Sequence, residues 1–247
     1  MNSIGIIPAR YASTRFPGKP LVDMGGKTMI QRVYEQARQA NLQQVLVATD
    51  DARIADAVRD FGGQVVLTGA EHQSGTDRCF EAYTRHDAPF DCIINIQGDE
   101  PFIQPEQINL VISCFESPAT QLATLIKEIA DPAELLNPNS PKVITDSRQQ
   151  ALYFSRHPIP YFRGAEPESW LQHHTYYKHI GIYGYRADIL EQITRLPPSR
   201  LEMAESLEQL RWLENGFKIM TAVTTQENIG IDTPADLEKA LLLLRNS

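Results

Sequence analysis

The stretch Ile-Gly-Ile-Ile-Pro-Ala-Arg-Tyr-Ala-Ser-Thr-Arg-Phe-Pro-Gly-Lys-Pro-Leu, residues 4–21, decides the fold. Its apolar run 4–7 is typical of a strand buried on both faces, and the run stops at Pro8, which cannot continue a central strand. The loop that follows carries three cations among small and hydroxyl-bearing residues: Arg10, Arg15 and Lys19. Cations at the carboxyl end of a first strand predict a polyphosphate site rather than a solvated basic loop.

The composition narrows the classes of function. The chain has 247 residues, 42% of them hydrophobic, and a formal net charge of −8. An acidic surface repels nucleic acid and anionic lipid, so we expect neither as a partner. The sequence contains no run of about 18 apolar residues, no export signal and no metal-type cysteine spacing. We therefore expect a cytoplasmic α/β protein that acts on small molecules.

Apolar runs alternate with helical periodicity through the first half of the chain. Strands are expected at 4–7, 45–49, 64–68 and 92–97, and helices around 30–37 and 54–61. This order predicts an open, mostly parallel, Rossmann-like sheet with helices on both faces. The loops that follow the strands should then face one crevice.

The regular alternation of predicted strands and helices ends near residue 122. We expect strands at 122–128, 143–146 and 178–185, a helix around 201–215, a strand at 218–224 and a final helix at 234–245. Residues 122–215 are interpreted as a smaller α+β subdomain. Residues 1–121 and 216–247 are interpreted as the nucleotide-binding domain.

Two acidic segments suggest a metal site. Gln97-Gly98-Asp99-Glu100-Pro101 ends an apolar strand, where a carboxylate facing a triphosphate is a natural Mg²⁺ ligand. The segment 230–234, Gly-Ile-Asp-Thr-Pro, offers Asp232 as a second ligand. Thr233 can at the same time cap a helix that begins with Pro234.

Other segments offer polar groups for ligands. Residues 72–78 open a helix, and Ser74 or Thr76 there is either an ordinary cap or a group that binds a base or phosphate. Arg156 ends an aromatic run and could pair with a carboxylate. His179 alone, and a Glu-rich helix at 205–211, are more often structural.

The motifs resemble those of 3-deoxy-manno-octulosonate (Kdo) cytidylyltransferases along nearly the whole chain. The similarity covers Pro-Ala-Arg-Tyr-Ala-Ser-Thr-Arg-x-Pro-Gly-Lys-Pro-Leu at 8–21, Gln-Gly-Asp-Glu-Pro at 97–101, Tyr-Phe-Ser-Arg at 153–156, Leu-Glu-Gln-Leu-Arg at 207–211 and Gly-Ile-Asp-Thr-Pro-x-Asp-Leu at 230–237. The resemblance implies a Mg²⁺-dependent enzyme that joins CTP and Kdo to give CMP-Kdo and pyrophosphate. It also implies that residues 122–215 bind the sugar and form the contacts of a homodimer, and that the enzyme acts in lipopolysaccharide biosynthesis.

The resemblance assigns roles to residues of this chain. The expected catalytic residues are Arg10, Lys19, Asp99 and Asp232, the last two as Mg²⁺ ligands. The expected CTP contacts are Pro8, Ala9, Arg10, Ser13, Thr14, Arg15, Lys19, Gln73, Ser74, Arg78 and Gln97. The expected sugar contacts are Arg156, His179, Tyr183, Glu208 and Gln209.

Two alternatives stay open. Region 163–177 is unlike familiar family members, so the sugar is either Kdo or a related acid such as 8-amino-Kdo, whose ammonium Glu166 or Glu168 could bind. A catalytically silent nucleotide-binding protein is the alternative from another class. The presence of both carboxylates and the phosphate cations argues against it.

Overall fold

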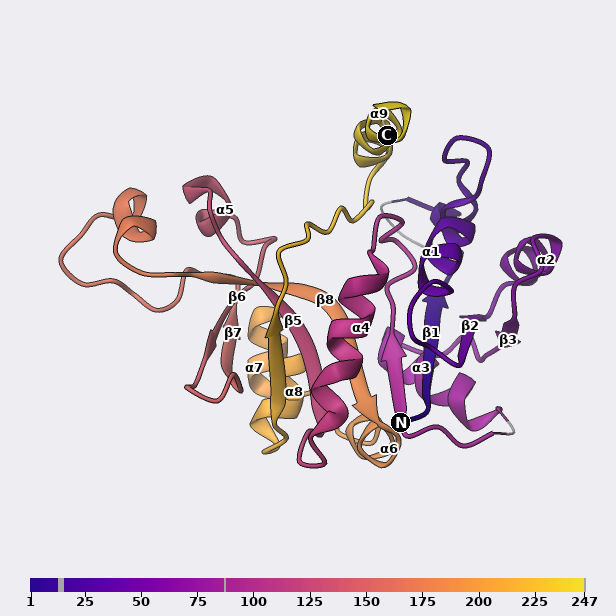
Figure 1. The fold of residues 1–247 in the computed structure, drawn as a ribbon, viewed down its shortest axis with the longest axis horizontal. Coiled ribbons are helices and arrows are strands. Elements are labelled where there is room, and N and C mark those ends of the chain that lie inside the picture. The colour runs from indigo at the N-terminus through magenta and orange to yellow at the C-terminus, as the bar shows by residue number, and fades with distance from the viewer. Residues whose placement is uncertain (13–15, 87, 247) are drawn as a thin grey trace. The chain divides into compact units, whose positions relative to one another are not determined.

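Contacts within the chain divide it into two units. The computed structural model describes residues 1–12, 16–86 and 88–246. Unit 1 consists of Met1–Ile112 and Asn228–Ser247, and unit 2 consists of Ser113–Glu227 (Figure 1). Within the described residues, no helix combines the length and apolar character needed to cross a membrane.

Unit 1 is built on four parallel strands in the order β3-β2-β1-β4. Their bounds are β1 Ser3–Ala9, β2 Gln44–Thr49, β3 Val65–Leu67 and β4 Cys92–Asn95. Residues 3–7 of β1 are all buried, and because successive side chains point to opposite faces, both faces of the strand are covered. The expected open parallel sheet is confirmed.

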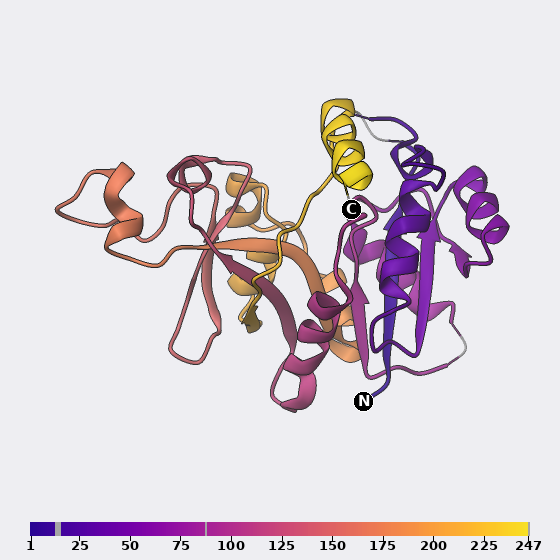
Figure 2. The same ribbon diagram turned by 45° about the horizontal axis from the view of Figure 1, so that its top comes forward.

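Helices of unit 1 cover this sheet with apolar stripes at helical spacing. α1, Met29–Ala37, buries Ile30, Val33 and Ala37 and packs against β1 and β2 (Figures 1 and 2). The other helices of the unit are α2 Ala52–Asp60, α3 Gly75–Thr84, α4 Pro105–Ser113 and α9 Pro234–Asn246, with a 3₁₀ turn, η1, at Lys19–Leu21. Thr28, Asp51 and Ser74 cap α1, α2 and α3 with their side chains, which explains where these helices begin.

Unit 2 has five strands of mixed direction. β5 Leu122–Glu128 pairs antiparallel with β8 Tyr177–Arg186 and parallel with β9 Ile219–Val223. β6 Lys142–Thr145 pairs antiparallel with both β7 Ala151–Ser155 and β8. Because β9 is hydrogen-bonded to β5, it belongs to unit 2, whereas the expected range 216–247 assigned it to the nucleotide-binding domain.

Short helices complete unit 2. They are η2 Cys114–Glu116, α5 Pro132–Leu136, η3 Pro167–Gln172, α6 Ala187–Thr194, α7 Arg200–Glu205 and α8 Gln209–Glu214. Residues 158–176, which carry η3, extend beyond the strands of unit 2 (Figures 1 and 2). They are anchored by a small separate core in which Trp170 and Tyr176 pack with Ile129 and Leu135.

The single helix expected around 201–215 is wrong, because Ser206 interrupts it with a left-handed backbone (φ 52°). Arg156 stabilises the interruption by donating Nε to Glu205 O at 2.6 Å and Nη2 to Ser206 O at 3.1 Å. The Glu205 carboxylate in turn accepts from Ser155 Oγ and from the Arg156 backbone N–H. The carbonyl groups of Glu205 and Ser206 therefore accept hydrogen bonds from the arginine instead of from backbone N–H groups of a continued helix.

A histidine lies inside the strand layer of unit 2. His179 on β8 is paired with Ile126, and its Nε2 is 2.9 Å from Thr124 Oγ1. Its ring meets the Phe154 ring edge-on at 5.3 Å. Burial lowers the pKa of His179 from 6.5 to about 3, so the folded chain holds it neutral.

This burial makes the stability of the chain depend on pH. Because the unfolded chain binds the proton near pH 6.5 and the folded chain does not, the free energy of unfolding should fall as the pH drops below about 6.5. Urea unfolding at pH 7 and pH 5 should show a loss that is larger in the wild type than in His179→Gln, by up to about 2 kcal/mol. The exposed His157→Gln is the control and should behave as the wild type; equal losses in all three proteins would contradict the prediction.

Candidate functional site

The loop after β1 is fixed by a tight turn. Gly18 adopts φ 72° and donates its N–H to Tyr11 O at 2.9 Å. A Cβ at this position would lie 3.1 Å from the Tyr11 ring, so both the backbone and the close contact favour glycine. The turn leads directly into η1, whose first residue is Lys19, so the position of this lysine follows from the glycine before it.

Lys19 bridges two carboxylates from distant parts of the chain. Its Nζ lies 2.6 Å from Asp99 Oδ2 and 3.2 Å from Asp232 Oδ1. The lysine side chain is 12% exposed, whereas those of Asp99 and Asp232 are 34% and 47% exposed. One cation is thus shared by two acids, and the predicted convergence of these three residues is present in unit 1.

The loop that carries Asp99 runs against the end of β1. A Cβ on Gly98 would lie 2.9 Å from Pro8 O, too close for any other residue without a shift of the backbone. The next residue after Asp99, Glu100, accepts a hydrogen bond from Asn228 Nδ2. Burial and the neighbouring Asp99 charge raise the pKa of Glu100 to about 8.

Asp232 is positioned by the start of α9. Ile231 N donates to Asp99 O at 3.0 Å, which joins the two acidic segments through the backbone. The Asp236 carboxylate accepts from Thr233 N and Thr233 Oγ1 at 3.0 and 2.8 Å, and Thr233 Oγ1 accepts from Asp236 N at 3.3 Å. The helix begins at Pro234, so Thr233 caps α9 as the sequence predicts and Asp232 precedes the cap.

The acidic pair fits a Mg²⁺ ion in its donor chemistry. Mg²⁺ is usually held by one or two carboxylates, with phosphate oxygens and water completing the octahedron. The shared contact with Lys19 Nζ shows that a positive charge is accommodated between the two acids. Among the described residues, no group of three or more His, Cys, Asp and Glu is arranged for a metal.

These residues line a cavity of about 220 Å³ in unit 1. Its walls come from the ends of β1 and β4, the start of α3 and the residue before the α9 cap. The lining residues are Pro8, Ala9, Arg10, Lys19, Pro20, His72, Gln73, Ser74, Gly75, Arg78, Gln97, Gly98, Asp99 and Asp232. Every expected CTP contact that lies in the described residues is in this list; Ser13, Thr14 and Arg15 lie outside the described residues.

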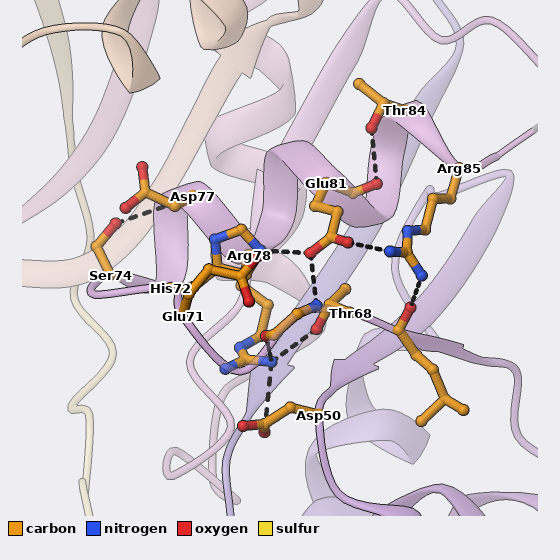
Figure 3. A network of polar contacts seen from close by, with 12 residues as sticks. Asp50, Thr68, Glu71, His72, Ser74, Asp77, Arg78, Glu81, Thr84 and Arg85 are labelled. Carbon is orange, nitrogen blue, oxygen red and sulfur yellow. Dashed lines mark hydrogen bonds and ion pairs between the residues drawn. The ribbon is translucent and has the colours of Figure 1, made fainter.

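Arg78 reaches the cavity wall, but its contacts are with the protein. The residue is 4% exposed, and its Nη1 donates to Thr68 Oγ1 at 2.6 Å and to Gly69 O at 3.2 Å (Figure 3). The same nitrogen lies 3.4 Å from Asp50 Oδ1 at the end of β2. The arginine therefore holds the loop before α3 onto the sheet, and direct contact with CTP stays a prediction.

Glu81, one turn further along α3, holds the same loop from the other side. Its carboxylate accepts from Gly69 N at 2.8 Å and contacts His72 Nε2 and Arg85 Nη2 (Figure 3). Burial alone would raise the pKa of Glu81, but the contacts with His72 and Gly69 outweigh it and lower the pKa. His72 and Glu81 were not among the expected site residues; the position of His72 in a strand-end loop was the available signal for it.

The expected sugar contacts all lie in unit 2. The rings of His179 and Tyr183 are 5.2 Å apart, and Tyr183 also packs edge-on against Trp212 at 5.0 Å. The Tyr183 hydroxyl is buried and has no hydrogen-bond partner among the described residues. Burial, with smaller contributions from Tyr185 and the nearby Glu208 charge, raises the pKa of Tyr183.

The three remaining sugar candidates are Arg156, Glu208 and Gln209, and their surroundings differ. Gln209 is 4% exposed at the start of α8, directly after Glu208. Arg156 uses its guanidinium for the carbonyls of Glu205 and Ser206 and for Pro138 O at 3.0 Å. It therefore fixes the turn that leads to Glu208 and Gln209, and its expected contact with a sugar stays a prediction.

Comparison with known proteins gives one consistent family. The cytidylyltransferase family model matches residues 4–219. A protein of Parabacteroides distasonis named 3-deoxy-manno-octulosonate cytidylyltransferase is 61% identical over 250 residues, covering 100% of this chain and 99% of its own length. A protein of the same name from Cytophaga hutchinsonii is 62% identical, with 96% of this chain and 95% of its own length covered.

Solved structures agree with the sequence relatives. A CMP:2-keto-3-deoxy-manno-octonic acid synthetase, solved as a complex with CTP, superposes with a TM-score of 0.92 at 45% identity and covers 100% of this chain and 99% of its own. A glucose-1-phosphate thymidylyltransferase described as putative, from Bacillus anthracis, shares the fold at a TM-score of 0.63 and 18% identity. The fold, the cavity and these matches together place the chain in the cytidylyltransferase family.

Proposed function

We propose that this chain transfers the cytidylyl group of CTP to Kdo and releases pyrophosphate. The anomeric hydroxyl of the sugar attacks the α-phosphorus of CTP, and the bond from that phosphorus to the bridging oxygen of pyrophosphate breaks. The single observation that carries the proposal is the meeting of Lys19, Asp99 and Asp232 at the wall of the unit 1 cavity. Phosphoryl transfer depends mainly on positioning and charge stabilisation, which such a cluster supplies.

The choice of Kdo is supported by the relatives. Proteins at 61% and 62% identity over nearly their full length carry the name 3-deoxy-manno-octulosonate cytidylyltransferase. The structural neighbour at 45% identity was solved with CTP bound. 8-Amino-Kdo, the alternative that region 163–177 leaves open, is the competitor in the assay.

The cations have a common role in the proposal. Arg10 is exposed at the end of β1 and Lys19 lines the same cavity, so both can bind the β- and γ-phosphates and stabilise the leaving pyrophosphate. The same role is proposed for Arg15 on the motif alone. Arg78 and Glu81 hold the loop 69–75, which lines the same cavity and offers Gln73 and Ser74 to the nucleoside.

Asp99 and Asp232 would hold Mg²⁺. When bound there, the ion supplies positive charge to the α-phosphate and lowers the pKa of the attacking hydroxyl. The carboxylates of this chain bind and orient, and Lys19 provides a second positive charge next to them. Homodimerisation through unit 2, a cytoplasmic location and a role in lipopolysaccharide biosynthesis are proposed on the resemblance and the composition.

The proposed reaction is tested by pyrophosphate release. CTP with Kdo and Mg²⁺ should give rapid release, UTP in place of CTP should give little, and EDTA should abolish it. 8-Amino-Kdo is the matched control for the sugar and should react more slowly than Kdo. Release with 8-amino-Kdo but not with Kdo would support the proposed reaction and show that the substrate is the amino sugar. No release with either sugar would contradict the proposal.

Removing the Asp99 charge should stop turnover without removing the nucleotide site. Asp99→Asn keeps the size of the side chain but weakens a metal ligand, so kcat should fall by about 100-fold or more. CTP affinity, measured by titration calorimetry in EDTA, should change little. Asp56→Asn on the exposed face of α2 is the control, and full activity of Asp99→Asn would contradict the assignment.

Removing the Lys19 charge should have opposite effects on catalysis and on metal binding. The ammonium lies between the two acids and competes with a metal ion there, so Lys19→Met should bind Mn²⁺ more tightly than the wild type when no nucleotide is present. Its pyrophosphate release should nevertheless be slower because a phosphate-binding cation is lost. Electron paramagnetic resonance of free Mn²⁺ measures the affinity, and unchanged or weaker binding would show that the lysine does not occupy the metal position.

A further inference from the structure

We propose that Asn228 is a positioning residue that fixes the Asp232 segment onto the Asp99 loop. The proposal rests on the proposed function, because it assigns a purpose to the meeting of these two acids. It extends that function to a side chain that lies outside the cavity lining. The observation behind it is a chain of hydrogen bonds through unit 1.

The chain of hydrogen bonds has one consistent direction. Gln104 N donates to Gln107 Oε1 at 3.0 Å, Gln107 Nε2 donates to Asn228 Oδ1, and Asn228 Nδ2 donates to Glu100 Oε2. Gln107 is 1% exposed, so its amide is held in one orientation by the interior of unit 1. Both ends of the Asn228 amide are therefore used, its oxygen toward α4 and its nitrogen toward Glu100.

The two segments joined in this way carry the two acids. Glu100 directly follows Asp99, and Asn228 precedes Asp232 by four residues. The backbone bond from Ile231 N to Asp99 O joins the same segments at a second point. Two attachments between the segments define the separation of the carboxylates better than one.

The acids need this support because packing does not supply it. Their side chains are 34% and 47% exposed, and both stand on loops rather than inside a strand or helix. Two carboxylates close together repel each other, and Lys19 offsets the repulsion only while it stays between them. A neutral amide link adds no charge to the site and holds the segments together when the lysine turns to a phosphate.

Swapping the acid and the amide tests the link. Asn228→Asp removes the amide N–H that Glu100 accepts and puts an oxygen in its place, while Glu100→Gln keeps an acceptor for Asn228. In the double variant, the new amide at position 100 can donate to the new carboxylate at position 228, and that carboxylate still accepts from Gln107. We expect Asn228→Asp to lower kcat by about 10-fold or more. The double variant should recover kcat to within about 3-fold of the wild type. Effects of this size are typical of the energetic coupling between residues in contact.

A binding measurement separates positioning from general loss of structure. Mn²⁺ affinity in the presence of CTP, followed by electron paramagnetic resonance, should weaken in Asn228→Asp and recover in the double variant. CTP affinity in EDTA should stay within about 2-fold of the wild type, because the cavity walls that bind the nucleotide are not altered. Asn139→Asp, the same change at an exposed site of unit 2, is the control and should affect neither quantity.

The possible results distinguish failure of this inference from failure of the proposed function. Wild-type kcat and Mn²⁺ affinity in Asn228→Asp would overturn the inference. So would a loss of either quantity that the double variant does not recover. An equally large loss of CTP affinity in EDTA would also overturn it. Absence of pyrophosphate release in the wild type would instead contradict the proposed function. Loss in Asn228→Asp with recovery in the double variant, for both kcat and Mn²⁺ affinity, is the predicted result.

Discussion

The site depends on one ammonium group held between two carboxylates. Lys19, Asp99 and Asp232 come from three separate segments, and each segment is brought to the cluster by a different element of unit 1. β1 and β4 are neighbouring parallel strands, so the loops after them meet at one edge of the sheet. The cap of α9 then adds the third member. Without the lysine charge the two acids would repel each other. The acids in turn attract the lysine ammonium and hold it at the cavity wall.

The cluster could be predicted because its members stand in local motifs with a clear physical meaning. An apolar run that reaches Pro8 predicts a buried strand, and the cations that follow indicate an anion site. Two acids after the apolar strand 92–97 indicate a cation site for the same reason. The expectation that Pro8 ends the strand was wrong, because β1 continues through Pro8 to Ala9 and stays paired with β2 at both residues. The cap at Thr233 follows from a Thr-Pro pair before a helical stretch. In each case, side-chain chemistry and chain direction suffice, because the edge of a parallel sheet brings the segments together.

The rest was set by contacts between distant residues, which a pattern along the chain does not contain. Arg78 and Arg156 were expected to face ligands, yet the guanidinium groups bond to protein oxygens at Thr68, Gly69, Glu205 and Ser206. The break at Ser206 could not be predicted from helical periodicity, because the bonds from Arg156 that favour it come from about 50 residues away. The pairing of β9 with β5 likewise depends on tertiary structure, and it moves the boundary of the units.

The account makes the acidic pair the place where metal and triphosphate meet, and a crystal structure with CTP and Mn²⁺ tests this most directly. The anomalous signal of Mn²⁺ should lie between Asp99 and Asp232, with Lys19 Nζ turned toward the phosphates. A metal bound to the triphosphate alone, with Lys19 still between the two carboxylates, would contradict the central claim.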